Sequence, residues 1–254
     1  MPRFAANLTW MFTELQMFDR FAAAAEAGFT GVEILFPYDL AAPQMYRAAV
    51  KAGVEIVLIN APPPNWAGGP RGFAAVPGNE ARFRRDFERS LRVAEALRAR
   101  HIHIMAGKAE GPDALQTYVD NLSWAAERAP HTSLTIEPLN QNDHPGYFLS
   151  CYDQAAEILG RIGAPNVGLQ LDTYHAEVIT GDMLATWARY APLVRHIQIA
   201  GHPGRHEPDQ GTLDYPAFFA ELDEWGYRGW VSAEYEPART TFSGLGWLAG
   251  AGQA

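Results

Sequence analysis

SLTIEPLNQNDHPGYFLSCYDQAAEILGRIGAPNVGLQLD, residues 133–172, contains two strand-like runs with a helical segment between them. The runs are SLTIEP (133–138) and NVGLQLD (166–172), and the segment YDQAAEILGRIG (152–163) has apolar residues at helical spacing. Strands that alternate with helices of ten or more residues indicate parallel β/α units. The stretch therefore predicts one such unit, and the same pattern recurs on both sides of it.

Eight strand-like runs can be counted along the chain, and helical periodicity fills most of the gaps between them. Several helical segments end in glycine, which is typical of a left-handed helix cap. Eight β/α units in 254 residues match the size of a (β/α)8 barrel. The six runs outside residues 133–172 are RFAANLT (3–9), GVEILF (31–36), VEIVLIN (54–60), HIHIMAG (101–107), VRHIQIAG (194–201) and GWVSAEY (229–235). The other helical segments are residues 15–28, 43–53, 79–99, 114–129, 183–191 and 215–226.

A doubly wound open sheet is the alternative α/β architecture. Such a sheet usually has fewer strands and a glycine-rich first turn. The turn after the first run here, LTWMFTEL (8–15), contains no glycine. We therefore predict an α/β fold, with a single (β/α)8 TIM barrel that spans residues 1–254.

Composition and charge limit the classes of partner. The formal net charge is −9 and no run of Lys or Arg is present, which argues against a nucleic-acid partner. Cys151 is the only cysteine, so no intrachain disulfide can form, and a reducing cytoplasm fits this. No run approaches the roughly 18 apolar residues that span a membrane, and the N-terminal stretch MPRFAANLTW does not have the pattern of a signal peptide. We expect a cytoplasmic protein without a membrane partner.

Polar side chains stand at the ends of the last four predicted strands. In a barrel of this kind, functional residues gather where strands end and loops begin. Because successive strands are neighbours, we expect these four side chains to converge. Period-two alternation directs the residues two positions earlier, Thr135, Gln170, His196 and Ser232, into the barrel as well. The four end residues are Glu137, Asp172, Gln198 and Glu234.

Three carboxylates and one carboxamide in one cavity would repel one another strongly without a cation. Burying a carboxylate is costly unless something compensates its charge. All four side chains offer oxygen, which favours a hard ion such as Mg²⁺ or Mn²⁺ over Zn²⁺. We therefore predict one divalent metal ion held by Glu137, Asp172, Gln198 and Glu234. The alternative is that each residue caps a local backbone segment or pairs with a loop arginine.

Three basic residues follow strands three, four and seven, and are candidates for holding an anionic substrate: Arg71, Lys108 and Arg205. An arginine can bind a carboxylate through two hydrogen bonds. The alternative is that each is a solvated surface charge.

His175, just past strand six, is a candidate substrate contact, with a merely packed histidine as its alternative. The Pro- and Gly-rich stretch 60–80 is predicted to be an active-site loop rather than a surface excursion. Glu33 and His103 can point inward, but we do not assign them as ligands.

Several motifs together resemble the xylose-isomerase-like barrel superfamily, and within it the hydroxypyruvate isomerase family. The similarity extends nearly from end to end, and IEPLN, LDTYH and GRHEPDQGTLDY are specific in combination. The motifs that carry it are RFAANLTWMF, GFTGVEILFPYD, NWAGGPRGFAAVPG, TIEPLNQNDHPGYFL, LQLDTYH, HIQIAGHPGRHEPDQGTLDY and GWVSAEYEP.

The resemblance implies roles for individual residues. The four strand-end residues match the family's metal ligands, and Glu137 and Glu234 also match its pair of acid–base carboxylates. His175 and Arg205 match substrate-contacting positions of related ketose epimerases. The resemblance further implies a homo-oligomer and a small 2-oxo acid as substrate. The expected reaction is the interconversion of hydroxypyruvate and tartronate semialdehyde through an enediolate.

Four alternatives to this reaction remain open. An isomerase of a four-carbon 2-oxo sugar acid would use the same residues. A ketose 3-epimerase typically has histidine where Gln198 stands. The superfamily's DNA-repair endonucleases use a histidine-rich cluster of several metal ions, whereas this chain lacks those histidines and is acidic overall. Ile59, where relatives often have histidine, argues against a second metal site. A non-catalytic sugar-acid binding protein would bind ligand and metal without exchanging substrate protons with solvent.

Overall fold

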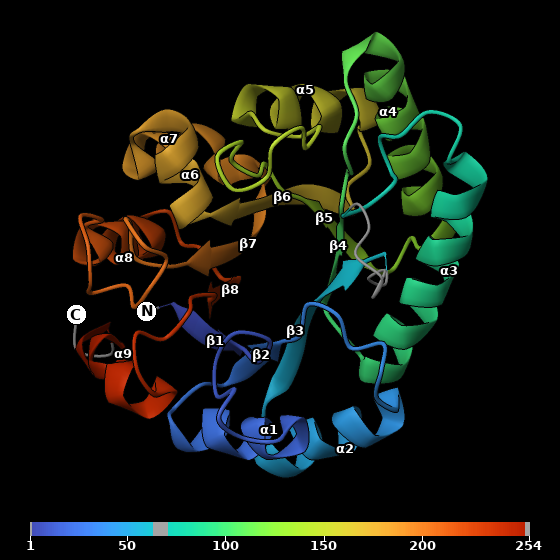
Figure 1. Ribbon diagram of the computed structural model, residues 1–254. Coiled ribbons are helices and arrows are strands. Elements are labelled where there is room, and N and C mark those ends of the chain that lie inside the picture. Colours follow the sequence, from blue (N-terminus) through green and yellow to red (C-terminus); the bar gives the residue numbers. More distant parts are fainter. Residues whose placement is uncertain (1, 63–70, 252–254) are drawn as a thin grey trace.

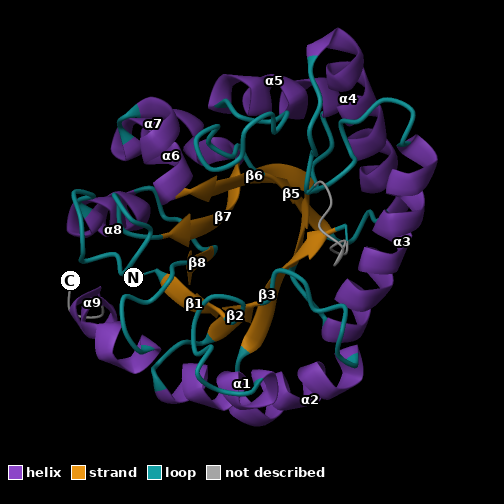
Figure 2. Ribbon diagram, in the orientation of Figure 1, coloured by secondary structure: helices purple, strands orange, loops and turns teal. Residues whose placement is uncertain are grey.

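The computed structural model describes residues 2–62 and 71–251. Its eight strands form a closed parallel barrel in chain order, and β8 pairs with β1 to close it. The helices surround the ring of strands (Figures 1 and 2). The predicted (β/α)8 fold class is confirmed. The strands are β1 (Arg3–Asn7), β2 (Gly31–Glu33), β3 (Glu55–Ala61), β4 (His101–Ile104), β5 (Ser133–Ile136), β6 (Val167–Asp172), β7 (Val194–Ile199) and β8 (Trp230–Ala233).

The described α-helices agree with the helical segments expected from periodicity, with additions in the second half of the chain. They are α1 (Met17–Glu26), α2 (Ala42–Ala52), α3 (Glu80–Leu97), α4 (Gly111–Arg128), α5 (Tyr152–Ile162), α6 (Thr173–Thr180), α7 (Met183–Tyr190), α8 (Tyr215–Glu224) and α9 (Gly246–Ala251). Two 3₁₀ helices, η1 (Ala191–Leu193) and η2 (Thr241–Gly244), complete the set. Within residues 2–62 and 71–251, no helix has both the length and the hydropathy needed to cross a membrane.

Helix α6 was not expected from the sequence, and it begins directly where β6 ends. The Asp172 side chain caps it, because one carboxylate oxygen accepts hydrogen bonds from the backbone N–H groups of Tyr174 (2.8 Å) and His175 (3.2 Å). Such a cap satisfies N–H groups that have no partner within the helix. The strand-to-helix junction therefore fixes the position of both Asp172 and His175.

The strands alternate between two environments. Outward-facing residues such as Ile102, Leu134 and Leu169 are fully buried in an apolar cluster shared with the surrounding helices. Each such side chain stabilises the fold by about 1.5–3 kcal/mol relative to an exposed one. Inward-facing residues of β5, β6 and β7 are polar, and they link neighbouring strands: Thr135 donates to Gln170, and Gln170 donates to Gln198.

Trp230 forms an apolar floor beneath this polar interior. It lies on the same face of β8 as Ser232 and Glu234, because side chains alternate along a strand. Its ring packs with Ala5 of β1 and Leu58 of β3 in a second buried cluster. The ring also covers Gly31 of β2, where a Cβ atom would lie 2.7 Å from a ring carbon of Trp230. Glycine at this position leaves the space that the indole fills.

We predict that Gly31→Ala lowers the free energy of unfolding by about 1–3 kcal/mol, because overpacking a close-packed core forces backbone or side-chain shifts. Gly160→Ala is the matched control, since residue 160 lies in helix α5 with open space around its Cα. The control should raise the free energy of unfolding by about 0.5–1 kcal/mol. Urea unfolding measures both, and equal effects of the two substitutions would contradict the packing argument.

Candidate functional site

The structure brings the four strand-end residues to one end of the barrel. Asp172 and Gln198 lie within β6 and β7 and are paired in register, while Glu137 and Glu234 come one residue after β5 and β8. The four side chains are buried, with exposed fractions between 0% and 6%. Strands β5 to β8 are successive neighbours in the barrel, as the sequence predicted.

Two other side chains connect the four. Gln170 Nε2 donates to Glu137 Oε2 (2.9 Å) and to Gln198 Oε1 (2.7 Å). Arg205 Nη2 donates to Asp172 Oδ2 (2.8 Å) and lies 3.5 Å from Glu234 Oε2. The cap and loop-arginine alternative is therefore partly realised at Asp172, which both caps α6 and pairs with Arg205. One guanidinium, however, contacts only Asp172 and Glu234 of the three buried carboxylates.

The pKa values of the three buried carboxyl groups are raised, so each group is harder to ionise here than in water. Burial, followed by the negative charges of Asp172 and Glu234, raises the pKa of Glu137 well above its ordinary value. Burial also raises the pKa of Glu234 well above its ordinary value, although Arg205 opposes the shift. The pKa of Asp172 is raised by burial, against Arg205 and the two backbone N–H groups that it caps. A further cation would relieve these penalties.

Arg205 is held by its backbone as well as by its charge. Its φ of 56° places it in the left-handed region, which is uncommon for a residue other than glycine. Its N–H donates to the Gly201 carbonyl (2.9 Å), and its carbonyl accepts from the N–H of Glu236 (3.0 Å). The loop after β7 is thereby tied to the segment after β8. These contacts aim the guanidinium at the carboxylates of both neighbouring strands.

His175 lies beside Asp172, and its hydrogen bonds leave Nε2 as a donor. Its Nδ1 accepts hydrogen bonds from the Asn140 backbone N–H (3.2 Å) and side-chain amide (2.7 Å). Burial and the charge of Arg205 lower the pKa of His175 well below its ordinary value, so the ring is neutral. A neutral imidazole that accepts at Nδ1 has its proton on Nε2. That Nε2 lies 3.8 Å from Asp172 Oδ2 and can donate to a ligand.

The residues present fit a divalent cation. One ligand atom from each of Glu137, Asp172 and His175 lies within 4.8 Å of the others, so this buried cluster could hold a metal ion. The hydrogen bonds to His175 Nδ1 leave the proton on Nε2, and a protonated nitrogen does not bind a metal ion. The ligands of the ion would therefore be oxygen atoms. Carboxylate and amide oxygens are the donors that hard ions such as Mg²⁺ and Mn²⁺ prefer. The guanidinium between Asp172 and Glu234 shows that these two carboxylates already accommodate positive charge.

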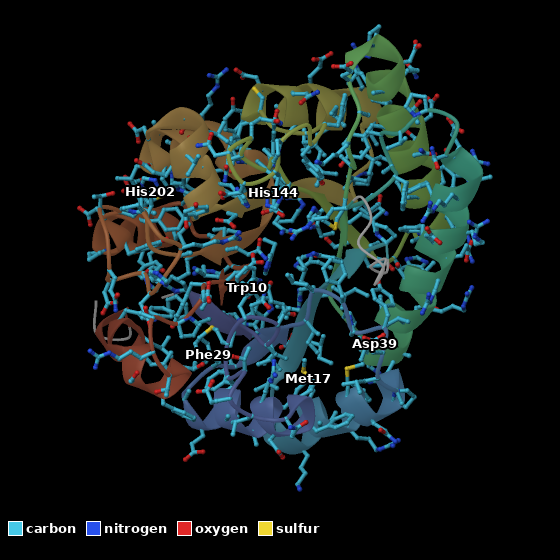
Figure 3. All side chains as sticks on the ribbon, viewed as in Figure 1. Trp10, Met17, Phe29, Asp39, His144 and His202 are labelled. Atoms are coloured by element: carbon cyan, nitrogen blue, oxygen red, sulfur yellow. The ribbon has the colours of Figure 1, made fainter. Side chains whose placement is uncertain are left out.

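A small cavity of about 40 Å³ opens above the cluster. Arg71, His175 and Arg205 line it together with Glu137 and Glu234. Other described residues of its wall are Trp10, Leu35, Phe36, Asn60, His103, Met105, Leu139 and His144. In Figure 3, Trp10 and His144 lie toward the middle of the view, over the barrel.

The three predicted basic residues therefore separate into two groups. Arg71 and Arg205 line the cavity, whereas the exposed Lys108 is not among its lining residues in the described part of the chain. Of the predicted active-site loop 60–80, residues 63–70 lie outside the described residues. Its described end supplies Arg71 to the cavity wall.

Sequence reasoning did not identify Asn60, Asn140 or His144 as site residues. Asn60 Oδ1 accepts a hydrogen bond from His103 Nδ1 (3.2 Å), and His103 Nδ1 lies 3.4 Å from Glu137 Oε2. Burial, followed by the charges of Arg71 and Arg205, lowers the pKa of His144 to about 4. The HP pair in QNDHPG was a visible signal for a loop histidine, but only the fold shows that this loop returns over the barrel.

Three polar atoms of the cavity wall are buried without a hydrogen-bond partner among the described residues. They are Trp10 Nε1, His103 Nε2 and Arg205 Nε. A buried polar group without a partner costs about 1–3 kcal/mol. Trp10 Nε1 and Arg205 Nε are donors, so this side of the cavity favours a ligand rich in acceptor oxygens.

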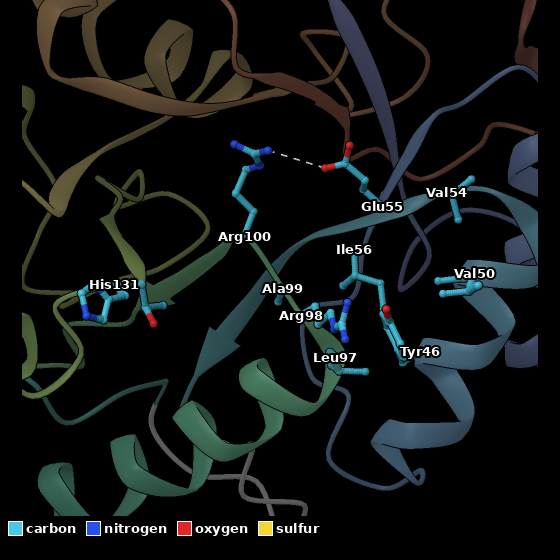
Figure 4. Close-up of a pocket in the computed structure, with 12 residues that line it drawn as sticks. Tyr46, Val50, Val54, Glu55, Ile56, Leu97, Arg98, Ala99, Arg100 and His131 are labelled. Atoms are coloured by element: carbon cyan, nitrogen blue, oxygen red, sulfur yellow. Dashed lines mark ion pairs between the residues drawn. The ribbon is translucent and has the colours of Figure 1, made fainter.

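A larger cavity of about 490 Å³ lies at the other end of the barrel (Figure 4). It is bounded by α2 and by the segments that lead into β3, β4 and β5, and Glu55 and Arg100 form an ion pair of 3.6 Å in it. In barrels of this type, active sites form at the carboxyl ends of the strands, where loops supply the chemistry. We therefore assign the functional site to the smaller cavity, which lies at the carboxyl ends of the strands.

Comparison with known proteins identifies the family. A family model described as xylose isomerase-like TIM barrel matches residues 21–251. The chain is 45% identical to 2-oxo-tetronate isomerase of Cupriavidus necator and 36% identical to hydroxypyruvate isomerase of Escherichia coli, in each case over 98% of both chains. A crystal structure from Brucella melitensis, described as an AP endonuclease of family 2, matches with a TM-score of 0.95 at 45% identity, covering 98% of this chain and 99% of that one. The chain belongs to the xylose isomerase-like TIM barrel family.

These findings confirm two expectations from the sequence. The resemblance to this family is correct and extends over nearly the full length. The expectation of an isomerase of the aldose–ketose type is confirmed by the relatives, which are named as isomerases.

The raised pKa of Glu137 predicts a pH dependence of stability in metal-free protein. Between the ordinary glutamate value of 4.5 and the higher folded-state pKa, the folded chain binds this proton more tightly than the unfolded chain. The free energy of unfolding should therefore fall as pH rises through this window, by up to about 1.4 kcal/mol per pH unit for one proton. Glu137→Gln removes the titrating group, so its stability should fall less steeply with pH. Urea unfolding with a chelator present measures this, and parallel curves for the two proteins would contradict it.

Proposed function

We propose that this protein isomerises short hydroxylated 2-oxo acids, and that it interconverts hydroxypyruvate and tartronate semialdehyde. The observation that carries the proposal is the pair Glu137 and Glu234. Both glutamates are buried, both have a raised pKa, and both line a small cavity that also contains Arg71 and Arg205. Two proton-transfer groups beside two cationic side chains suit an anionic substrate that must lose and regain a proton.

The reaction moves two protons and leaves the carbon skeleton intact. A base removes a proton from carbon 3 of hydroxypyruvate, and the electron pair forms the C2–C3 double bond of an enediolate while the C2 oxygen gains charge. Carbon 2 then takes a proton as the C3 hydroxyl gives up its own and becomes a carbonyl. The oxygen at carbon 2 ends as a hydroxyl, which gives tartronate semialdehyde.

Glu137 and Glu234 are the proposed acid–base pair. An unperturbed glutamate, with a pKa near 4.3, is a weak base toward a carbon-bound proton. Burial and neighbouring carboxylates raise the pKa of both groups, which brings them closer to the operating pH, where acid–base catalysis is most effective. The two side chains come from β5 and β8. One can remove the proton while the other delivers it.

Glu137, Asp172, Gln198 and Glu234 would hold the divalent ion, for which Mg²⁺ and Mn²⁺ are the candidates. When bound, such an ion supplies Lewis-acid stabilisation to substrate oxygens that gain negative charge. The chain contributes the ligand oxygens and the hydrogen bonds that orient them. His175, with its Nε2 proton directed to this side, can donate to a substrate oxygen beside Asp172.

The substrate carboxylate is proposed to bind Arg71 and Arg205. Their combined charge is felt inside the cavity, because both residues lower the pKa of His144 after the effect of burial. The unpartnered donors Trp10 Nε1 and Arg205 Nε would gain acceptors from the same ligand.

A four-carbon 2-oxo-tetronate is the second candidate substrate. The observation in its favour is that relatives named 2-oxo-tetronate isomerase reach 45% identity, compared with 40% for those named hydroxypyruvate isomerase or putative hydroxypyruvate isomerase. This acid is a hydroxypyruvate with a hydroxymethyl group on carbon 3, so the same two proton transfers apply. The size of the cavity beyond carbon 3 would decide between the two.

Proton NMR in D₂O tests the reaction and the role of Glu137. With Mg²⁺ or Mn²⁺ present, we expect deuterium to enter carbon 3 of hydroxypyruvate and tartronate semialdehyde to appear. A metal-stripped control should show neither. Glu137→Gln should lower turnover by about 10³-fold or more because it removes a positioned acid–base group. Exchange with 2-oxo-tetronate alone would favour the second candidate, and binding without exchange of either acid would indicate a binding protein.

Removing Arg71 should weaken substrate binding. We expect Arg71→Ala to raise KM about 10- to 100-fold with a smaller change in kcat, because a hydrogen bond to a charged group contributes about 1.5–3 kcal/mol. Lys108→Ala is the matched comparison, since Lys108 is an exposed cation beyond the cavity wall. Steady-state kinetics on both variants separate the two. A larger effect of Lys108→Ala would reverse the assignment.

A further inference from the structure

The amide of Gln198 is held at both ends inside the barrel. Its Nε2 donates to Glu33 Oε1 (2.8 Å), and its Oε1 accepts from Gln170 Nε2 (2.7 Å). The two ends of a carboxamide have nearly the same shape, so hydrogen-bond partners decide which way it points. A carboxylate only accepts, and Glu33 therefore requires the NH₂ end of Gln198.

Glu33 is itself fixed by donors from two other strands. Asn7 Nδ2 donates to Glu33 Oε1 (2.7 Å), and His196 Nε2 donates to Glu33 Oε2 (2.9 Å). Glu33 and His196 are both fully buried. The direction of Asn7 is set in turn by the backbone, because its Oδ1 accepts from the N–H of Thr9 (2.9 Å). A series of hydrogen bonds thus runs from a main-chain group through Asn7 and Glu33 to Gln198.

The opposite orientation of Gln198 would be unfavourable at both ends. Its oxygen would face the oxygens of Glu33, and its NH₂ group would face that of Gln170. Gln170 cannot reverse to accommodate it, because its own Oε1 accepts from Thr135 Oγ1 (3.0 Å) and its Nε2 also donates to Glu137 (2.9 Å). Glu33 and Gln170 therefore select the same orientation, with the Gln198 oxygen on the side of Glu137.

We infer that Glu33 is a positioning residue that makes Gln198 present oxygen, rather than nitrogen, to the cation site. The inference rests on the proposed metal site, since a hard cation binds the amide through its oxygen. Glu33 would act on the ion only through Gln198. Groups that orient metal ligands typically change metal affinity by about 10- to 100-fold when they are altered.

Titration with Mn²⁺, following the free ion by electron paramagnetic resonance, tests this without measuring turnover. Glu33→Gln keeps the shape of the side chain but adds an NH₂ group among three donors, so Gln198 loses its fixed direction. We expect Mn²⁺ affinity to fall about 10- to 100-fold. Wild-type affinity in this variant would overturn the inference.

The exchange variant Glu33→Gln/Gln198→Glu supplies the decisive comparison. It conserves the total charge and places a carboxylate at position 198. A carboxylate offers oxygen at either end, so the need for orientation disappears and Mn²⁺ affinity should return to within about tenfold of wild type. An affinity no better than that of Glu33→Gln would overturn the inference. If Glu33→Gln does not fold, the exchange variant alone is compared with wild type on the same criterion.

Asn121→Ala controls for a general loss of stability. Asn121 is buried on α4, and its Nδ2 donates to the Ala74 carbonyl (2.8 Å), away from Gln198. Asn121→Ala should lower the thermal midpoint without changing Mn²⁺ affinity, and a comparable loss of affinity would contradict a specific role for Glu33.

Deuterium exchange into substrate is measured separately. Wild-type protein that binds Mn²⁺ but exchanges no substrate proton would defeat the proposed reaction and leave the role of Glu33 standing, whereas no Mn²⁺ binding would defeat both.

Discussion

Mutual repulsion among Glu137, Asp172 and Glu234 is the constraint on which the carboxyl end of this barrel is built. Parallel strands of a closed barrel bring their ends together, so acidic residues at neighbouring ends must share one small volume. Burial there raises the pKa of all three groups. The left-handed Arg205, the cap on α6 and the amide of Gln170 each place positive charge or a donor against one or two of these carboxylates.

The same constraint explains why the interior of the barrel is polar. Barrel interiors of this class are dominated by branched apolar side chains, whereas here Thr135, Gln170 and His196 occupy inward positions and are fully buried or nearly so. Each is hydrogen-bonded to another strand. The apolar stabilisation is supplied instead by the shell between strands and helices and by the Trp230 floor.

Local periodicity was enough to predict the barrel and its four converging strand ends, because alternation along a strand is a property of the backbone. It could not place residues whose position depends on loops returning over the barrel, such as His144 and Asn140. Nor could it show that Lys108 and Arg71 differ, since both simply follow a strand. On the third strand, the residue that reaches the cavity is one position away from the residue that the sequence comparison considered. Ile59 lies in the outer apolar shell, and the neighbouring Asn60 is the residue that lines the cavity.

The total charge of the proposed metal site explains why a neutral residue suits position 198. With three carboxylates, a divalent ion would leave one negative charge, which Arg205 can offset, and an anionic acid could then approach. A fourth carboxylate at position 198 would upset this balance at the surface of the cavity. The additional negative charge of the barrel lies one layer deeper, at Glu33, where Asn7, His196 and Gln198 all donate to it. The negative charge that orients the Gln198 amide is thus kept apart from the proposed cation site, to which the amide presents its oxygen.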